Sequence, residues 1–257
     1  MAILKNSFNY EGTGLISGKN QCIEVLPAKR NSGITFINKK TGNEVAAVAS
    51  NVIDTTHSVT LGNKHMQISL VEHLMAALAL TKVQDVDIVV EGAEIPIADG
   101  SSKIFYDLIK QAELIKQPED YQALTLSEPL AFTYKHTSIT LVPADSFRIT
   151  YLVNFENSPY SYTWHKWESS INKIDDIIAS RTFGYTKDLP AYQAMGLALG
   201  VTINNTIGIN EDGSLTTDLR YPHEPVRHKI LDLIGDLYLS GINPLNLNAH
   251  VIAIECG

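Results

Sequence analysis

Cysteine, long apolar runs and clustered positive charge are all scarce in this sequence. Only Cys22 and Cys256 occur, so we expect no disulfide framework, and a reducing compartment fits. The longest uninterrupted apolar run, Leu74 to Leu80, is far shorter than the roughly 20 residues of a membrane-spanning helix. Residues 1–9 contain one lysine and no long apolar core, which is not the pattern of a secretory signal.

The net charge is negative, which argues against a nucleic-acid partner. Twenty basic and 28 acidic residues give −8, and they are spread along the chain. A nucleic-acid-binding protein of this size would show a basic face. We therefore expect a cytoplasmic protein with no transmembrane segment and no nucleic-acid partner.

What the sequence does contain is an ordinary globular composition over 257 residues, 44% of them hydrophobic. Short strand-like segments followed by helices occur twice, which predicts an α+β fold in two halves, 1–117 and 121–257. The polar segment 116–120, which contains a proline, is the expected linker. Strands are expected at 22–27, 33–37, 44–49, 86–90, near 124, and at 139–142, 147–154 and 203–209. Helices are expected at 71–81, 103–112, 174–181 and 225–239.

The helix predicted over 225–239 has two unlike faces. One stripe is apolar and comprises Val226, Ile230, Leu233, Ile234 and Leu237. The opposite side carries His228, Asp232 and Gly235, with Asp236 at its margin. Two interpretations stay open: a solvated face with a His–Asp pair four residues apart, or two ligands for one metal ion. Gly235 counts against the solvated face, because glycine inside an exposed helix costs about 1 kcal/mol.

The segment 68–78 also allows two interpretations. Ser69 followed three residues later by Glu72 is a capping-box pattern, which would explain the glutamate without any chemistry. His73 fits a core histidine satisfied by a backbone group. Alternatively, the adjacent pair supplies one metal ligand, His73, and one base for an attacking water, Glu72.

Two further segments are rich in polar residues and turn formers. The loop 94–101 reads as a structural turn before the next helix. The segment 180–184 reads as a helix C-terminus ending at Gly184. Thr182 within it has a hydroxyl that can donate a hydrogen bond to a reacting oxygen.

In combination, these segments resemble the UDP-3-O-acyl-N-acetylglucosamine deacetylases, zinc amidases that catalyse the committed step of lipid A synthesis in Gram-negative bacteria. The matching stretches are Gly12-Thr-Gly-Leu15, Val71-Glu-His-Leu74, Glu94-Ile-Pro-Ile97 with Asp99-Gly-Ser101, Ser180-Arg-Thr-Phe-Gly184 and Arg227-His-Lys-Ile-Leu-Asp232. They follow the family's order across nearly the whole chain. The resemblance implies two βα domains packed helix to helix, as a β-α-α-β layered sandwich with the active site between them.

The resemblance also implies the centre of that site. His73, His228 and Asp232 would bind Zn²⁺, although Fe²⁺ suits the same ligand set. Glu72 would be the general base toward the attacking water. Thr182 would hold the oxyanion beside the metal.

The resemblance also implies which residues would contact the substrate. Lys229 would meet the diphosphate of a UDP-linked acylated glucosamine. Phe183 and Phe155 would contact its sugar and uracil. The segment Tyr192 to Val201 would take the fatty acyl chain.

The sequence departs from the family's pattern in three places. Ile16 replaces a histidine near the start, and Thr56-His57 replaces a positively charged residue. The family also has a C-terminal catalytic histidine, oriented by the aspartate that matches Asp236. Here the sequence stops at Gly257, before that position, and His250 lies too early in the expected strand to replace it. Two interpretations stay open: a shortened deacetylase, or a homologue that binds zinc and a UDP-sugar but catalyses little.

Overall fold

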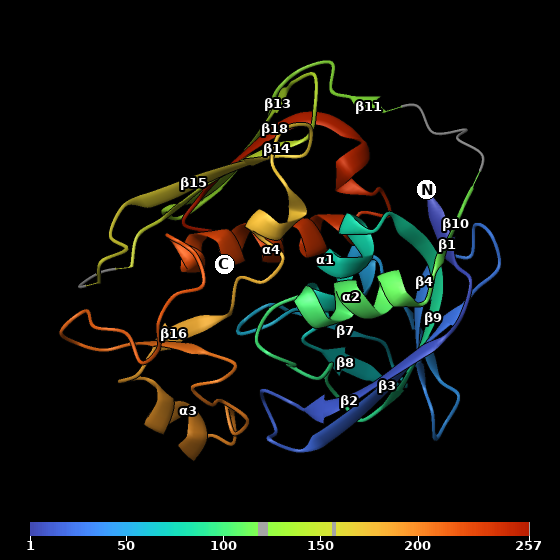
Figure 1. The fold of residues 1–257 in the computed structure, drawn as a ribbon, viewed down its shortest axis with the longest axis horizontal. Helices are drawn as coiled ribbons and strands as arrows, with labels where there is room; N and C mark the ends of the chain where they lie inside the picture. Colours follow the sequence, from blue (N-terminus) through green and yellow to red (C-terminus); the bar gives the residue numbers. More distant parts are fainter. Residues whose placement is uncertain (118–122, 156–157, 257) are drawn as a thin grey trace.

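A layer of helices lies in the middle of the protein between two β-sheets (Figure 1). The computed structural model describes residues 1–117, 123–155 and 158–256. The helices are α1 (Glu72–Leu80), α2 (Lys103–Gln111), α3 (Leu189–Ala194) and α4 (Glu224–Tyr238), with 3₁₀ turns η1 (Ala49–Asn51), η2 (Ile174–Asp176) and η3 (Pro244–Asn246). Helices α1 and α4 pack on each other, and α2 packs on α1. Within the described ranges, no helix is both long and apolar enough to span a membrane.

The first sheet is built around one central strand, β9. Its strand order is β10 (Leu114–Lys116), β1 (Ala2–Leu4), β9 (Val83–Glu91), β3 (Asn20–Pro27) and β2 (Phe8–Thr13); β4 (Ile34–Asn38) pairs with β9, and β5 (Glu44–Ala46) pairs with β4. Alternate residues of β9, including Val86, Ile88 and Val90, are buried, the period of two expected of a strand. A separate small sheet, β6 (Val52–Asp54), β7 (Thr60–Gly62) and β8 (Gln67–Ser69), leads into α1.

The second sheet covers the other side of the helix layer. Its order is β12 (Leu130–Tyr134), β13 (Thr137–Pro143), β18 (Leu247–Ile254), β14 (Arg148–Val153) and β15 (Thr163–Glu168), with β11 (Leu124–Thr125) paired to β18. Helix α4 packs on β14 and β15, while α1 contacts β9 of the first sheet. The order sheet, helices, sheet confirms the α+β layered class. The linker predicted at 116–120 lies outside the described residues from 118 onward, and the division into two domains stays a prediction.

One predicted helix, 174–181, is absent. Only the single turn η2 forms, and residues 183–185 become strand β16 (Phe183–Tyr185), paired in parallel with β17 (Ile207–Ile209). The reason is tertiary: the Arg181 N–H donates to the Glu224 carboxylate and the Thr182 N–H donates to the Gly100 carbonyl. The last donor of the predicted helix, the Arg181 N–H, and the donor that follows it thus bond to partners distant in sequence, and the chain continues into β16 instead of a helix.

The solvated-face interpretation of 225–239 is wrong, and Gly235 shows why. His228 is only 2% exposed, and Gly235 and Leu239 are also buried. A Cβ placed on Gly235 would lie 2.2 Å from the Glu72 carbonyl oxygen and 3.0 Å from the Ala76 nitrogen. Helix α4 therefore presses directly onto the backbone of α1, and the glycine permits the approach.

Gly235→Ala is expected to destabilise the protein by about 1–3 kcal/mol, because overpacking outweighs alanine's better helix propensity. The added methyl would meet rigid backbone atoms of α1. Urea unfolding monitored by circular dichroism measures the change. Gly184→Ala is the control, since a Cβ there would meet nothing within 4 Å. Equal unfolding midpoints for the two variants would contradict the argument.

Candidate active site and metal centre

Three predicted ligands meet where α1 and α4 cross. His73 comes from α1, and His228 and Asp232 come from consecutive turns of α4. One ligand atom from each lies within 4.8 Å of the others. The Nε2 atoms of His73 and His228 are 3.5 Å and 3.3 Å from Oδ1 of Asp232, and the two rings are perpendicular.

This cluster fits a divalent cation. Oδ1 of Asp232 is buried and has no hydrogen-bond partner among the described residues. A buried carboxylate oxygen left unpaired would carry a large desolvation cost. Two imidazole nitrogens and one carboxylate oxygen are a ligand set that catalytic Zn²⁺ sites use, with a further position open to water or substrate.

The protonation states suit the same interpretation. Burial lowers the pKa of His228 to about 4, so its ring is neutral, as a metal ligand must be. The Ser180 carbonyl lies 2.9 Å from His228 Nδ1 and can only accept, so Nδ1 carries the hydrogen and Nε2 faces Asp232. Burial alone would raise the pKa of Asp232, but the His228 and His73 rings hold it well below its usual range. Burial opposes a charged His73, yet Asp232 raises the pKa of that ring.

The capping-box interpretation of Ser69 and Glu72 is wrong. Ser69 lies in β8 and its hydroxyl is hydrogen-bonded to the hydroxyl of Thr60 at 2.9 Å. The residue that precedes α1 is Val71, which makes no side-chain cap. Glu72 instead accepts a hydrogen bond from the Val59 N–H at 3.1 Å. The glutamate is thus not explained as a helix cap.

Glu72, the predicted base, lies beside the ligand cluster, and its pKa is raised. It is buried and directly precedes the ligand His73. Burial raises the pKa of Glu72 to about 7, with the His73 ring opposing the rise and Asp232 adding to it. A carboxylate with a pKa near neutrality can both accept and return a proton.

Asp236 lies one turn beyond Asp232 on α4. Its Oδ1 is buried without a hydrogen-bond partner in the described part of the chain. Burial, together with the charges of Glu72 and Asp232, raises its pKa well above the usual value. His250 lies elsewhere, in β18, where its Nε2 is 2.9 Å from the Thr150 hydroxyl.

The other predicted site residues surround the cluster. Nζ of Lys229 is 3.7 Å from Oδ2 of Asp232. The Phe183 ring lies 6.1 Å from the His228 ring and 4.8 Å from the Phe155 ring. Thr182 follows Arg181 in the loop that passes over α4, and it lines the adjoining pocket. The structure therefore brings these residues together; their roles stay predictions.

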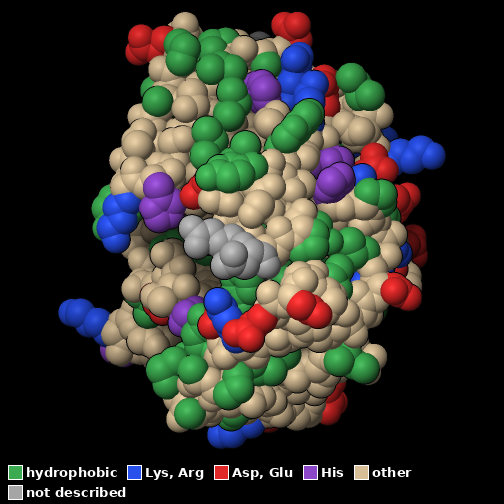
Figure 2. Space-filling view, turned by 90° about the vertical axis from the view of Figure 1, so that its left-hand side faces the viewer, with side chains coloured by type: hydrophobic (Ala, Val, Ile, Leu, Met, Phe, Trp, Pro, Cys, Tyr) green, Lys and Arg blue, Asp and Glu red, His purple; other side chains and the backbone are tan. Residues whose placement is uncertain are grey.

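The pocket that adjoins Thr182 and Phe183 has a volume of about 620 Å³. The segment 192–201 supplies part of its wall through Tyr192, Leu197, Ala198 and Val201. Its other walls include Leu15, Ile16, His57, Ser58 and Leu70. Figure 2 shows the side of the molecule on which α3 lies, where hydrophobic side chains form several separate groups at the surface. The apolar lining suits an alkyl chain.

The loop 94–101 is a structural turn, as the simpler interpretation held. Glu94 accepts hydrogen bonds from the Ile16 and Ser17 backbone N–H groups at 2.7 Å and 2.9 Å. A Cβ on Gly14 would lie 2.1 Å from the Glu94 carboxylate, so that position requires glycine. Two motifs far apart in the sequence thus fix each other and one wall of the pocket.

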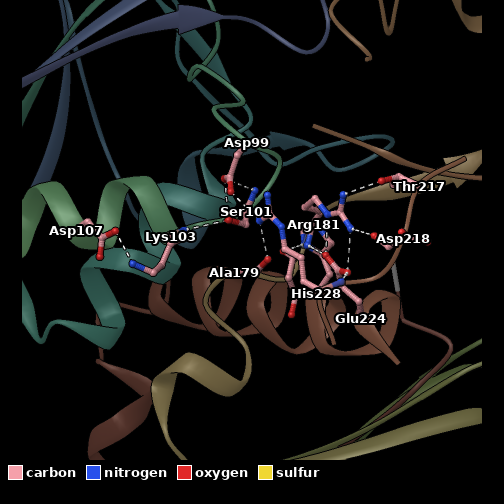
Figure 3. A network of polar contacts seen from close by, with 12 residues as sticks. Asp99, Ser101, Lys103, Asp107, Ala179, Arg181, Thr217, Asp218, Glu224 and His228 are labelled. Atoms are coloured by element: carbon pink, nitrogen blue, oxygen red, sulfur yellow. Dashed lines mark hydrogen bonds and ion pairs between the residues drawn. The ribbon is translucent and has the colours of Figure 1, made fainter. Parts of the chain in front are cut away.

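Sequence reasoning missed a charged cluster beside His228, at the N-terminal end of α4. Arg181, Arg220, Glu224 and Asp99 interlock there (Figure 3). Arg181 is the second residue of the segment 180–184, and Glu224 is the first residue of α4, directly before Pro225. The sequence shows an arginine in one motif and a glutamate at the start of the other, but no local pattern indicates that the two residues form an ion pair.

A buried His–His–Asp cluster beside a carboxylate base is the arrangement of a metal-dependent hydrolase. The comparisons with known proteins give the family. The family model described as LpxC, UDP-3-O-acyl N-acetylglycosamine deacetylase, matches residues 2–257. The chain belongs to this family, which confirms the resemblance seen in its motifs.

Named relatives agree. The UDP-3-O-acyl-N-acetylglucosamine deacetylase of Leptospira biflexa is 34% identical over 261 residues, covering 99% of this chain and 84% of the relative. The proteins of the same name from Chlamydia abortus and Chlamydia trachomatis serovar D are each 36% identical over 260 residues. These matches cover 99% of this chain and 91% and 89% of the relatives.

Proposed function

We propose that this protein removes the N-acetyl group of UDP-3-O-(3-hydroxyacyl)-N-acetylglucosamine, releasing acetate and a free amine in the committed step of lipid A synthesis. The observation that carries the proposal is the His73, His228 and Asp232 cluster beside Glu72. An apolar pocket lies near it, since Phe183 lines that pocket and its ring is 6.1 Å from the His228 ring. Family membership and the names of the relatives support the choice of substrate.

The ligand set would hold Zn²⁺, and Fe²⁺ would suit it as well. Nε2 of His73, Nε2 of His228 and Oδ1 of Asp232 face one another and would supply the bonds. When bound, such an ion supplies Lewis acidity toward the acetamide carbonyl and the attacking water.

Side chains of the protein transfer the proton of the attacking water and stabilise the negative charge that develops on the acetamide oxygen. Glu72 accepts the proton that the water loses as it attacks the acetamide carbon. The Thr182 hydroxyl donates a hydrogen bond to the developing oxyanion. As the C–N bond breaks, protonated Glu72 returns that proton to the leaving amine. Asp236, whose pKa burial raises, can hold a hydrogen bond as a neutral acid beside Glu72.

Substrate recognition is assigned to the surrounding residues. Lys229 offers an ammonium group to the diphosphate. Phe183 and Phe155, already in contact with each other, offer ring faces to the sugar and uracil. The pocket lined by 192–201 takes the 3-O-acyl chain, whose burial supplies about 0.8 kcal/mol per methylene.

Loss of the acyl chain from the substrate is expected to lower kcat/KM on the order of 100-fold, because four buried methylenes contribute about 3 kcal/mol. Acetate release by the metal-loaded enzyme from the acylated substrate and from UDP-N-acetylglucosamine measures the ratio. Equal kcat/KM values for the two substrates would contradict the assignment of the pocket to the acyl chain. Absence of acetate release from both, with metal bound, would contradict deacetylation itself.

A further inference from the structure

A buried ion pair lies beside His228 at the N-terminal end of α4 and takes no part in the chemistry proposed above. The side chain of Arg181 is 6% exposed and that of Glu224 is fully buried. Nε and Nη2 of Arg181 donate to Oε1 and Oε2 of Glu224 at 2.9 Å and 3.1 Å, a two-pronged contact (Figure 3). Such pairs combine charge with fixed geometry.

Glu224 accepts from more donors than this. The Arg181 backbone N–H donates to Oε1 at 2.9 Å, and the Arg220 backbone N–H donates to Oε2 at 2.6 Å. Burial would raise the pKa of Glu224, but the Arg181 side chain and these backbone donors lower it, so the group stays ionised. Four donors converge on two oxygens, and only a carboxylate accepts from all of them.

The pair fixes two segments that the site needs in register. Arg181 stands between Ser180, whose carbonyl holds His228 Nδ1, and Thr182. Glu224 is the first residue of α4, one turn before His228. The ion pair therefore ties the carbonyl that orients the imidazole to the helix that carries it. The preceding residue, His223, has a positive φ of 57°, and such a conformation persists only where its surroundings enforce it.

The same cluster reaches the backbone of His73, the residue that carries the second imidazole. Nη1 of Arg220 donates to the Asp99 carboxylate at 2.7 Å and to the Ala179 carbonyl at 2.9 Å. Asp99 also accepts from the Ser101 hydroxyl at 2.8 Å. The next residue, Ser102, donates its hydroxyl hydrogen to the backbone carbonyl of His73 at 2.8 Å.

We propose that Glu224 is a positioning residue for the metal centre, acting through Arg181 and the Ser180 carbonyl to hold the His228 ring with Nε2 toward Asp232. The inference rests on the proposed function, which makes His228 a metal ligand. Stability alone is a weak explanation for the pair, since a buried ion pair gains little over apolar packing of similar volume. Groups that orient a ligand imidazole, in contrast, tune metal affinity.

Glu224→Gln is expected to weaken Zn²⁺ binding about 10–100-fold, the usual effect of losing a group that orients a ligand. Glutamine has one acceptor oxygen, and its amide hydrogens would oppose the Arg181 donors. Competition with a chromophoric chelator measures the dissociation constant, and the visible absorption spectrum of the Co²⁺-substituted protein reports the ligand geometry. Asp85→Asn is the matched control, because Asp85 is 1% exposed and accepts from the Gly33 N–H in the first sheet.

Supporting results are weaker Zn²⁺ binding and an altered Co²⁺ spectrum in Glu224→Gln, with both unchanged in Asp85→Asn. Wild-type affinity and an unaltered spectrum in Glu224→Gln would overturn the inference, whatever its thermal midpoint. Should that variant not fold, Glu224→Asp keeps the charge and both oxygens but withdraws them by one methylene. An unchanged Co²⁺ spectrum and an unchanged Zn²⁺ affinity in Glu224→Asp would also overturn the inference. Failure of the wild type to bind Zn²⁺ would instead overturn the proposed function and, with it, this inference.

Discussion

Replacing Glu72 with glutamine is expected to lower kcat for acetate release about 10²–10⁴-fold, the usual contribution of a general base. Glutamine matches the glutamate in shape and can still accept the hydrogen bond from the Val59 N–H. It cannot take a proton from water at neutral pH. The variant should therefore fold and bind metal like the wild type, and lose only the proton-transfer step.

Separate measurements of kcat and of metal content distinguish this role from a structural one. Glu168→Gln serves as the control, since Glu168 is also buried but lies in β15 and hydrogen-bonds to Ser146 and Ser170. We expect it to keep kcat within about threefold, since losses of 10² or more mark a general acid or base. A Glu72→Gln variant with kcat near the wild-type value would refute the base assignment. A variant that loses metal along with kcat would mean that Glu72 maintains the ligand cluster instead.

The parts of this fold that sequence predicted are those governed by local periodicity. The apolar stripe of 225–239 became helix α4, because a pattern with a period of 3.6 buries its apolar side chains on one face only in that form. The uninterrupted run Leu74 to Leu80 forms most of α1, which is buried on every side. Two of the three predicted ligands, His228 and Asp232, lie four positions apart on α4. The motif order supplied the partner His73, which periodicity alone could not distinguish from a core histidine.

What sequence could not predict depends on contacts between distant segments. The helix expected at 174–181 does not extend beyond one turn, and the backbone donors at its expected end, Arg181 and Thr182, bond to Glu224 and Gly100, two residues that no local pattern brings near. The capping box at Ser69 failed because that residue is held in strand β8 by Thr60. Gly235 gave a real signal, a close approach by another group, but only the structure identified that group as the backbone of α1.

Asp232→Asn is expected to weaken Zn²⁺ binding by more than about 100-fold, beyond the loss typical of a group that only orients a ligand. Asp232 is the sole carboxylate of the described cluster, and its Oδ1 is the atom that both Nε2 atoms approach. An amide oxygen in its place carries no charge to offset the cation. The two remaining imidazoles would also lose the anion that balances them.

The loss shows most directly as a missing thermal shift. For the wild type, Zn²⁺ at 100 times its dissociation constant should add about 2.7 kcal/mol of stability and raise the unfolding midpoint. The same concentration should leave the midpoint of Asp232→Asn close to its metal-free value. Asp145→Asn, an exposed aspartate in the second half of the chain, should keep the full shift. If Asp232→Asn keeps it too, the ion that stabilises the fold is bound elsewhere, and His73 and His228 lose their assignment as its ligands.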